Sequence, residues 1–148
     1  MGSTAADRPW LEQYTHGKPN ENEPGKERDL AEVREQSVSQ YADRTACSFM
    51  GRDFSYAELD RHSRALAACL QGLGLQRGER IAVMLPNLPQ YPVAVAAILR
   101  AGCVLVNVNP LYTPRELEQQ LRDSGAKAIL VLEQFAVTLQ ACLARTDV

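Results

Sequence analysis

The sequence predicts an α/β fold in which a mostly parallel sheet carries helices on both faces and follows an N-terminal β-hairpin. From residue 80 onward, short apolar runs alternate with helix-like segments across short loops, which is typical of βαβ units. The run at 80–85 is apolar almost throughout, as expected of a strand that is buried on both faces. Upstream, two β-prone runs at 45–50 and 53–56 flank a two-residue turn, which indicates the hairpin.

The N-terminal stretch differs in composition from the rest of the chain. Residues 17–29 hold no large apolar side chain, so this stretch cannot bury itself. We therefore expect residues 1–28 to be a tag and a mobile N-terminal arm or linker, and residues 29–148 to form the folded subdomain. Trp10 and Tyr14 belong to a small apolar cluster in the arm, which either docks on the domain or lies loose.

Two helices are expected around the hairpin. The face of the first consists of Leu30, Val33, Val38 and Tyr41. The hairpin turn, Gly51-Arg52 with glycine first, favours type II′. Ser55 and Glu58 form a capping box that starts the second helix. Its apolar stripe consists of Leu59, Leu66, Leu70 and Leu73, and Gly72 and Gly74 offer a C-terminal stop.

The βαβ region divides into three strands and three helices. Strands are expected at 80–85, 103–108 and 126–133, and helices at 89–101, between Thr113 and Gly125, and at 134–145. Pro92 fits the first of these helices only if it falls in the first turn. Thr113 and Glu116 form another capping box, with Pro114 at the first helical position.

Composition excludes several functional classes. The chain has 148 residues and a formal net charge of −2, so it lacks the basic excess of a nucleic-acid binder. No apolar run reaches the roughly 18 residues of a membrane span. The four cysteines lie among apolar residues without C-x-x-C spacing, and we expect them to be reduced and buried. His16 and His62 have no partners at zinc-ligand spacing.

Candidate site residues come from the expected carboxyl ends of the parallel strands, where ligands approach such sheets. They are Asn87, Asn109 and Tyr112, and Asn87 could instead cap the helix that follows. The glycines at 72, 74 and 78 follow a helix rather than a strand, so they do not form a dinucleotide-binding loop. Glu118 and Arg122 are spaced as a solvated helix pair, and Arg100 and Arg115 are expected to be surface groups.

Two segments carry a family resemblance. FSYAELDRHSRALAACLQGLGLQRGERIAVMLPN and ILRAGCVLVNVNPLYTPREL resemble recurring segments of the adenylate-forming (AMP-binding) enzymes, and the stretch NVNPLYTPREL is similar to fatty acyl and related acyl-CoA ligases. The resemblance runs from about Trp10 to Val148 and implies the N-terminal part of a bacterial long-chain fatty acid–CoA ligase. The implied fold is part of the large N-terminal domain of such an enzyme.

The resemblance implies a two-step reaction for the parent enzyme. A fatty acid and ATP, with Mg²⁺, give an acyl-adenylate, and CoA then displaces AMP. The family's T-S-G-T-T-G-type phosphate loop has no match in this sequence. We therefore assign no catalytic, cofactor-binding or metal-binding residue and expect the chain alone to be inactive. Other expectations are a cytoplasmic location with peripheral contact with the inner membrane, packing of the remaining parent chain on this subdomain, and self-association through surfaces left open.

Two alternatives stay open from the residues. The parent could prefer medium-chain or aromatic acids, because the residues of the acyl tunnel are not in this chain. The βαβ order alone also fits a stand-alone flavodoxin-like binding or signalling module.

Overall fold

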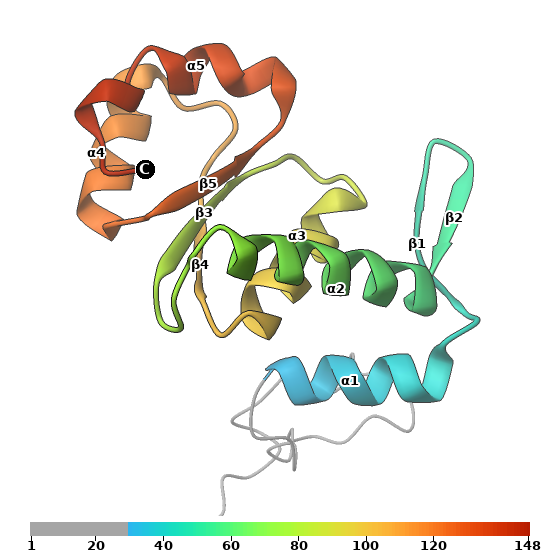
Figure 1. Cartoon of the computed structure of the whole chain (residues 1–148). Helices are drawn as coiled ribbons and strands as arrows, with labels where there is room; N and C mark the ends of the chain where they lie inside the picture. Colours follow the sequence, from blue (N-terminus) through green and yellow to red (C-terminus); the bar gives the residue numbers. More distant parts are fainter. Residues whose placement is uncertain (1–29) are drawn as a thin grey trace, which may run out of the picture.

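The computed structural model describes residues 30–148, so the predictions for residues 1–28, including the Trp10 cluster, lie outside the described residues. The elements in chain order (Figure 1) are α1 (Leu30–Tyr41), β1 (Thr45–Phe49), β2 (Arg52–Ser55), α2 (Tyr56–Gly72), β3 (Arg80–Met84), α3 (Gln90–Arg100), β4 (Val104–Asn107), α4 (Pro114–Ser124), β5 (Ala128–Val131) and α5 (Ala136–Gln140). Short 3₁₀ turns at Glu133–Phe135 and Leu143–Arg145 flank α5. The α/β class is as predicted.

The main sheet is parallel, with strand order β4-β3-β5. Ile81 of the central strand lies opposite Leu105 on one side and Ala128 on the other. The strands β1 and β2 form a separate antiparallel pair. The predicted parallel sheet and the predicted hairpin are therefore both confirmed.

The sheet divides the core into two clusters. Ile81 and Val83 of β3 face the first core cluster, whereas Ala82 and Met84 face the second core cluster, as the period of two along a strand requires. Helices α2 and α3 cover the first face, and α4 with the segment around α5 covers the second (Figure 1). Helices on both faces were predicted and are confirmed.

The hairpin turn differs from the prediction. Phe49 pairs with Arg52, so the two turn residues are Met50 and Gly51 rather than Gly51 and Arg52. Both have positive φ, 49° for Met50 and 78° for Gly51. Positive φ at both positions is the pattern of a type I′ turn, whose twist matches that of the flanking strands. The predicted type II′ turn was wrong because Arg52 is needed to complete the strand pairing.

The predicted helix starts are confirmed. The side chain of Ser55 accepts from the Glu58 N–H, and the Glu58 carboxylate accepts from the Ser55 N–H. The same reciprocal pair joins Thr113 and Glu116 at the start of α4. Pro92 lies in the first turn of α3, where its missing N–H costs no helical hydrogen bond.

The predicted apolar faces of α1 and α2 need correction. Leu30 and Val33 are exposed, and no residue of α1 is buried. On α2, Leu70 is buried but Leu73 is 72% exposed, because Leu73 caps the helix at its C-terminal end. Ser63 is buried instead, and its hydroxyl donates to the Asp60 carbonyl oxygen.

The predicted helix at 134–145 is broken into short pieces. It consists of two 3₁₀ turns and the five-residue α5. The break after α5 lies at Cys142, which is buried and has a φ of −123°, outside the helical range, and the break before α5 lies at Phe135, whose φ is −103°. The Cys142 N–H donates to the carbonyl of Leu139, three residues back, so the helical ladder ends there.

The four cysteines are free but not all buried. Cys103 and Cys142 are buried, Cys47 is half-buried and Cys69 is exposed. The prediction of burial was wrong for Cys69 because Cys69 and Ala68 lie on the outward side of α2, while Ala67 and Leu70 beside them face the core; apolar neighbours in sequence do not fix which side faces the core.

Candidate functional site

Asn87 lies in the loop that follows β3. It is exposed and lines a hollow of about 230 Å³ together with Phe49 of the hairpin and Tyr91 of α3. It does not cap α3, as had been considered, because the N-cap residue is Pro89, which makes no side-chain hydrogen bond. Helix α3 begins three residues after Asn87, too late for Asn87 to act as its N-cap.

Asn109 and Tyr112 lie in the loop that follows β4. The Asn109 Oδ1 accepts from the Leu111 N–H at 3.0 Å, which is an Asx turn. Tyr112 is half-buried against the second core cluster and lines a groove of about 560 Å³ along α4. This groove shares no lining residue with the hollow at Asn87, so the structure does not gather the three candidates around one cavity.

A polar link at the end of β4 escaped the sequence reasoning. The hydroxyl of Tyr91 donates to the Asn107 Oδ1 at 2.8 Å, and the Gln120 amide donates to the Asn107 carbonyl oxygen at 2.8 Å. One residue thereby joins α3 and α4 to the central layer. The sequence shows an asparagine at the last position of a strand, but it does not show the partners of that asparagine, which lie 16 and 13 residues away.

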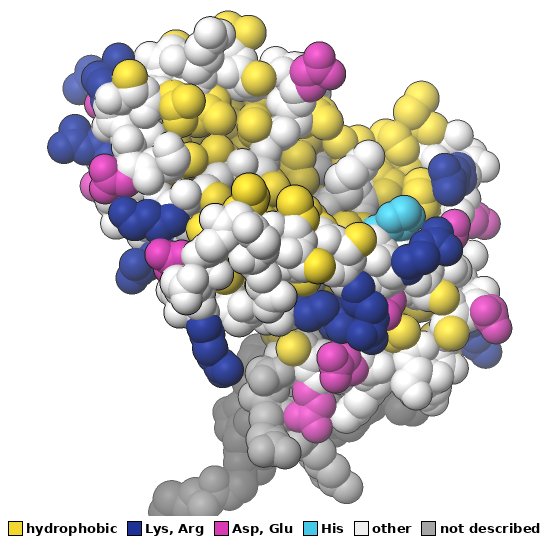
Figure 2. Space-filling view, in the orientation of Figure 1, with side chains coloured by type: hydrophobic (Ala, Val, Ile, Leu, Met, Phe, Trp, Pro, Cys, Tyr) yellow, Lys and Arg dark blue, Asp and Glu magenta, His cyan; other side chains and the backbone are white. Residues whose placement is uncertain are grey.

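An apolar groove lies beside the hairpin. Its volume is about 370 Å³, and its lining includes Phe54, Leu59, Val93 and His62. Pro89 lines both this groove and the hollow at Asn87, so the two adjoin. Figure 2 shows a histidine next to hydrophobic side chains on the face in view.

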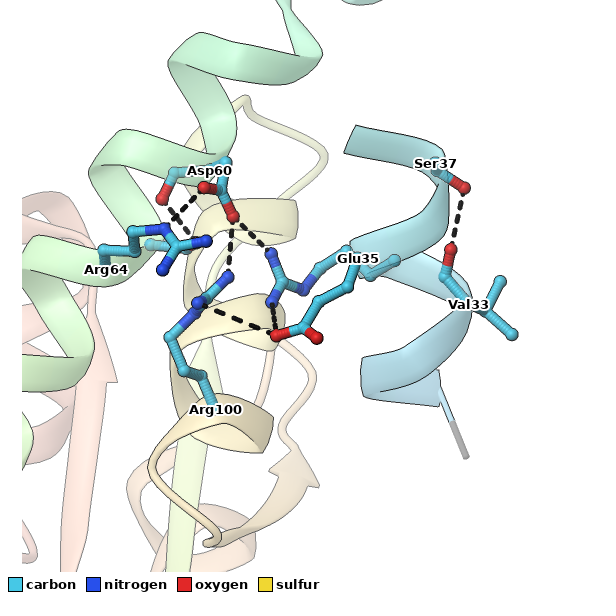
Figure 3. Close-up of polar contacts among 8 residues, drawn as sticks. Val33, Glu35, Ser37, Asp60, Arg64 and Arg100 are labelled. Atoms are coloured by element: carbon cyan, nitrogen blue, oxygen red, sulfur yellow. Dashed lines mark hydrogen bonds and ion pairs between the residues drawn. The ribbon is translucent and has the colours of Figure 1, made fainter. Parts of the chain in front are cut away.

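The most concentrated charge in the described residues surrounds Asp60 on α2 (Figure 3). Its carboxylate accepts from Arg34 of α1 at 2.8 Å, from Arg64 at 2.6 Å and from Arg100 of α3 at 2.6 Å. Arg100 is therefore not the surface group that was predicted, since only 17% of its side chain is exposed. The i,i+4 spacing of Asp60 and Arg64 indicates this one pair in the sequence. Arg34 and Arg100 lie 26 and 40 residues from Asp60, so no local pattern indicates them.

Opposing effects act on the titration of this cluster. Burial works to raise the pKa of Asp60, but hydrogen bonds from Arg64 and Arg34 and the charge of Arg100 outweigh it and lower the pKa. Burial lowers the pKa of Arg100, and repulsion by Arg34 acts in the same direction. At neutral pH the cluster therefore holds a carboxylate among three guanidinium ions.

The described residues present surface grooves and two open strand edges. Within residues 30–148, no group of three or more His, Cys, Asp or Glu side chains is placed to hold a metal ion. Glu58 and Glu116 serve capping boxes, and hydrogen bonds from Ser55 and Thr113 lower their pKa values. What the arrangement can do is present apolar grooves and open strand edges to other chain segments.

Comparison with known proteins decides the family. Residues 34–147 match the model of the AMP-binding enzyme family, which is most of the chain. The chain belongs to the AMP-binding enzymes. This membership favours the ligase interpretation over a stand-alone flavodoxin-like module.

Relatives of this chain include long-chain-fatty-acid–CoA ligases. It is 52% identical over 140 residues to the enzyme of Escherichia coli O6:H1, 49% identical over 143 residues to that of Yersinia pestis and 40% identical over 128 residues to that of Bacillus subtilis. These matches cover 94%, 96% and 86% of the chain. They cover 25%, 25% and 23% of the relatives, so the chain spans about a quarter of their length.

Solved AMP-binding enzymes share the fold. A benzoate CoA ligase from Burkholderia xenovorans LB400 superposes with a TM-score of 0.74 at 27% identity, over 79% of this chain and 24% of that one. MbtA from Mycobacterium smegmatis superposes with a TM-score of 0.73 at 31% identity, over 78% of this chain and 22% of that one. The hairpin and the parallel sheet thus belong to a larger enzyme architecture.

Proposed function

We propose that residues 29–148 are a scaffold subdomain of an ATP-dependent long-chain fatty acid–CoA ligase, with residues 1–28 as an arm. The observation that carries this proposal is the 52% identity to such a ligase across 94% of the chain. In the proposed reaction, the fatty acid carboxylate attacks the α-phosphate of ATP and releases diphosphate. The CoA thiol then attacks the acyl carbon of the acyl-adenylate, releasing AMP. Mg²⁺ would offset the charge on the phosphates.

The 148-residue chain by itself is proposed to be inactive. No T-S-G-T-T-G-type phosphate loop occurs in its sequence. The chain therefore lacks the backbone N–H donors and the lysine that such a loop provides to the phosphates. The test incubates the chain with Mg·ATP and a long-chain fatty acid and follows diphosphate release, with calorimetry for nucleotide binding. We expect neither release nor saturable binding. Formation of adenylate would overturn the inactivity while leaving the family membership intact.

Long-chain fatty acids are the proposed substrates of the parent enzyme. The three relatives described above are long-chain ligases, whereas the benzoate CoA ligase is related at only 27% identity. The test expresses the complete reading frame that contains this sequence and compares acyl-CoA formation from palmitate, octanoate and benzoate. We expect kcat/KM to be highest for palmitate. Highest activity on octanoate or benzoate would favour the medium-chain or aromatic alternative.

The remainder of the parent chain is the proposed partner of the exposed apolar surfaces. Within the described residues, β4 and β5 each have one unpaired edge. Val104 on the β4 edge is 46% exposed, and the groove beside Phe54 is lined largely by apolar residues. Unpaired edges and apolar patches promote association. The isolated chain should therefore self-associate.

Sedimentation velocity at increasing protein concentration tests this surface. A lysine on an exposed strand edge disfavours edge pairing, so Val104→Lys should shift the chain toward monomer. Val137, which is 74% exposed on α5, provides the matched control Val137→Lys. A wild-type chain that stays monomeric throughout would contradict the proposal, as would equal effects of the two variants.

The proposed location of the parent enzyme is the cytoplasm, with peripheral contact with the inner membrane. The support is the amphiphilic character of its proposed substrate. No helix in residues 30–148 combines the length and the apolar character that crossing a bilayer requires. Co-sedimentation of the full-length protein with lipid vesicles, with and without palmitate, tests the peripheral contact.

A further inference from the structure

Helix α1 is docked with little apolar burial: Val38 and Tyr41 are half-buried, and the Tyr41 ring lies 6.3 Å from that of Tyr56. Leu30 is 69% exposed, Val33 is 43% exposed, and no residue of α1 is buried. The helix nevertheless contacts both α2 and α3. Neither core cluster contains a residue of α1. The hydrophobic contribution that stabilises most protein helices is therefore small here.

A closed ring of four charged side chains joins the three helices (Figure 3). The Asp60 Oδ1 lies 2.8 Å from Arg34 Nη1 and 2.6 Å from Arg100 Nη2. The Glu35 Oε1 lies 3.9 Å from Arg34 Nη2 and 3.9 Å from Arg100 Nη1. Two carboxylates thus alternate with two guanidinium groups, and α1 supplies one of each.

The C-terminal end of α1 is attached in a different way. The Arg44 N–H donates to the Tyr41 carbonyl, the Tyr56 N–H to the Arg44 carbonyl and the Ala57 N–H to the Ala42 carbonyl. These backbone bonds tie the segment after α1 to the start of α2. They lie about 10 Å along the helix from Arg34, at about 1.5 Å per residue. Backbone hydrogen bonds therefore hold α1 at residues 41–44, and ion pairs hold it at Arg34 and Glu35.

The charged ring is only partly satisfied. The side chains of Arg34, Asp60 and Arg100 are 19%, 12% and 17% exposed. The Nε and Nη2 atoms of Arg34 and the Nε atom of Arg100 are buried without a hydrogen-bond acceptor. Removing such groups from water costs free energy that the ion pairs must offset. Detachment of α1 would rehydrate these groups and recover part of that cost.

The remaining fold does not depend on α1 for its core. Helix α2 starts at its own capping box, and Ala67 and Leu70 pack in the cluster that includes α3 and the sheet. We propose that α1 is a hinged strap: the ring of Arg34, Glu35, Asp60 and Arg100 clasps it on α2 and α3, and it opens as a unit while the α/β body stays folded. This inference concerns the described residues themselves and does not rest on the proposed ligase activity.

Hydrogen–deuterium exchange followed by mass spectrometry on the 148-residue chain tests the strap. Asp60→Asn removes the central charge, and we expect exchange of the α1 amides to accelerate about tenfold, as for loss of hydrogen bonds to a charged group. Amides of β3 should exchange at the wild-type rate, because opening leaves the body folded. Arg34→Gln weakens the ring from the strap side alone and should give the same selective effect, so the test survives if Asp60→Asn fails to fold.

The matched control is Glu118→Gln on α4. It also removes a paired carboxylate, since Glu118 accepts from Arg145 at 2.7 Å, but it is not part of the ring. Exchange in α1 should stay at the wild-type rate in this variant. The proposal is overturned if Arg34→Gln leaves α1 exchange unchanged, if α1 and β3 accelerate together, or if Glu118→Gln accelerates α1 as much as the ring variants do.

Discussion

The Tyr91 hydroxyl donates to the Asn107 side-chain oxygen at 2.8 Å and joins the first turn of α3 to the last residue of β4. The loops that follow β3 and β4 begin at this end of the sheet. The bond links the start of α3 to the strand, and the neighbouring Pro89 lines both apolar hollows.

Tyr91→Phe should lower the free energy of unfolding by about 0.5 kcal/mol, since an exposed neutral hydrogen bond contributes at the low end of its usual range. Urea unfolding followed by circular dichroism measures the change. Tyr112→Phe is the control, because the Tyr112 hydroxyl makes no hydrogen bond within residues 30–148 and its loss should be neutral. Equal destabilisation by the two variants would contradict a role for the bond.

Leu117→Ala should be one of the most damaging single changes in the chain. Leu117 is fully buried in the second core cluster between α4 and the sheet. Removing a buried leucine side chain leaves a cavity and costs about 2–5 kcal/mol. Leu111 is 83% exposed in the preceding loop, so Leu111→Ala should cost less than about 0.5 kcal/mol. The difference between the two urea midpoints is the measurement, and similar midpoints would show that the second cluster is not a packed core.

The thiols should differ in reactivity toward a disulfide reagent. Cys69 is exposed, whereas burial raises the pKa of the Cys103 and Cys142 thiols and reduces their thiolate fraction. We expect Cys69 to react first, Cys47 more slowly, and the buried pair only when the chain opens. The variant Cys69→Ser should lose the fast phase, and urea should make all remaining thiols react together. A fast phase that persists in Cys69→Ser would contradict the assigned exposures.

Asp60 should make stability depend on acid pH. Its folded pKa lies below the ordinary 3.8, so its contribution is fully present above the unfolded value and is lost as pH falls through the folded one. The stability difference between wild type and Asp60→Asn should be constant near neutral pH and shrink below about pH 4. Unfolding in urea across this range measures it. A difference that grows on acidification would have the wrong sign for this pairing.

Local patterns in the sequence determined much of the fold. The capping boxes at Ser55 and Thr113 and the apolar strand at 80–85 act through neighbouring residues, so their structural meaning can be read from spacing alone. The same patterns supported the alternation of strands and helices. The candidate site was less predictable, because Asn87, Asn109 and Tyr112 were chosen by their positions at strand ends and the structure gives them separate surroundings.

The tertiary structure alone decided which polar and apolar groups meet. Arg100 reads as a surface residue in sequence, but the fold places it against Asp60 from 40 residues away. Leu30 and Val33 read as a core face, but α1 is clasped by charge and leaves them exposed. Cys142 is buried and lies outside the helical φ range, although the sequence around it predicts a continuous helix. Such outcomes depend on contacts between distant segments, whose free energies no local pattern encodes.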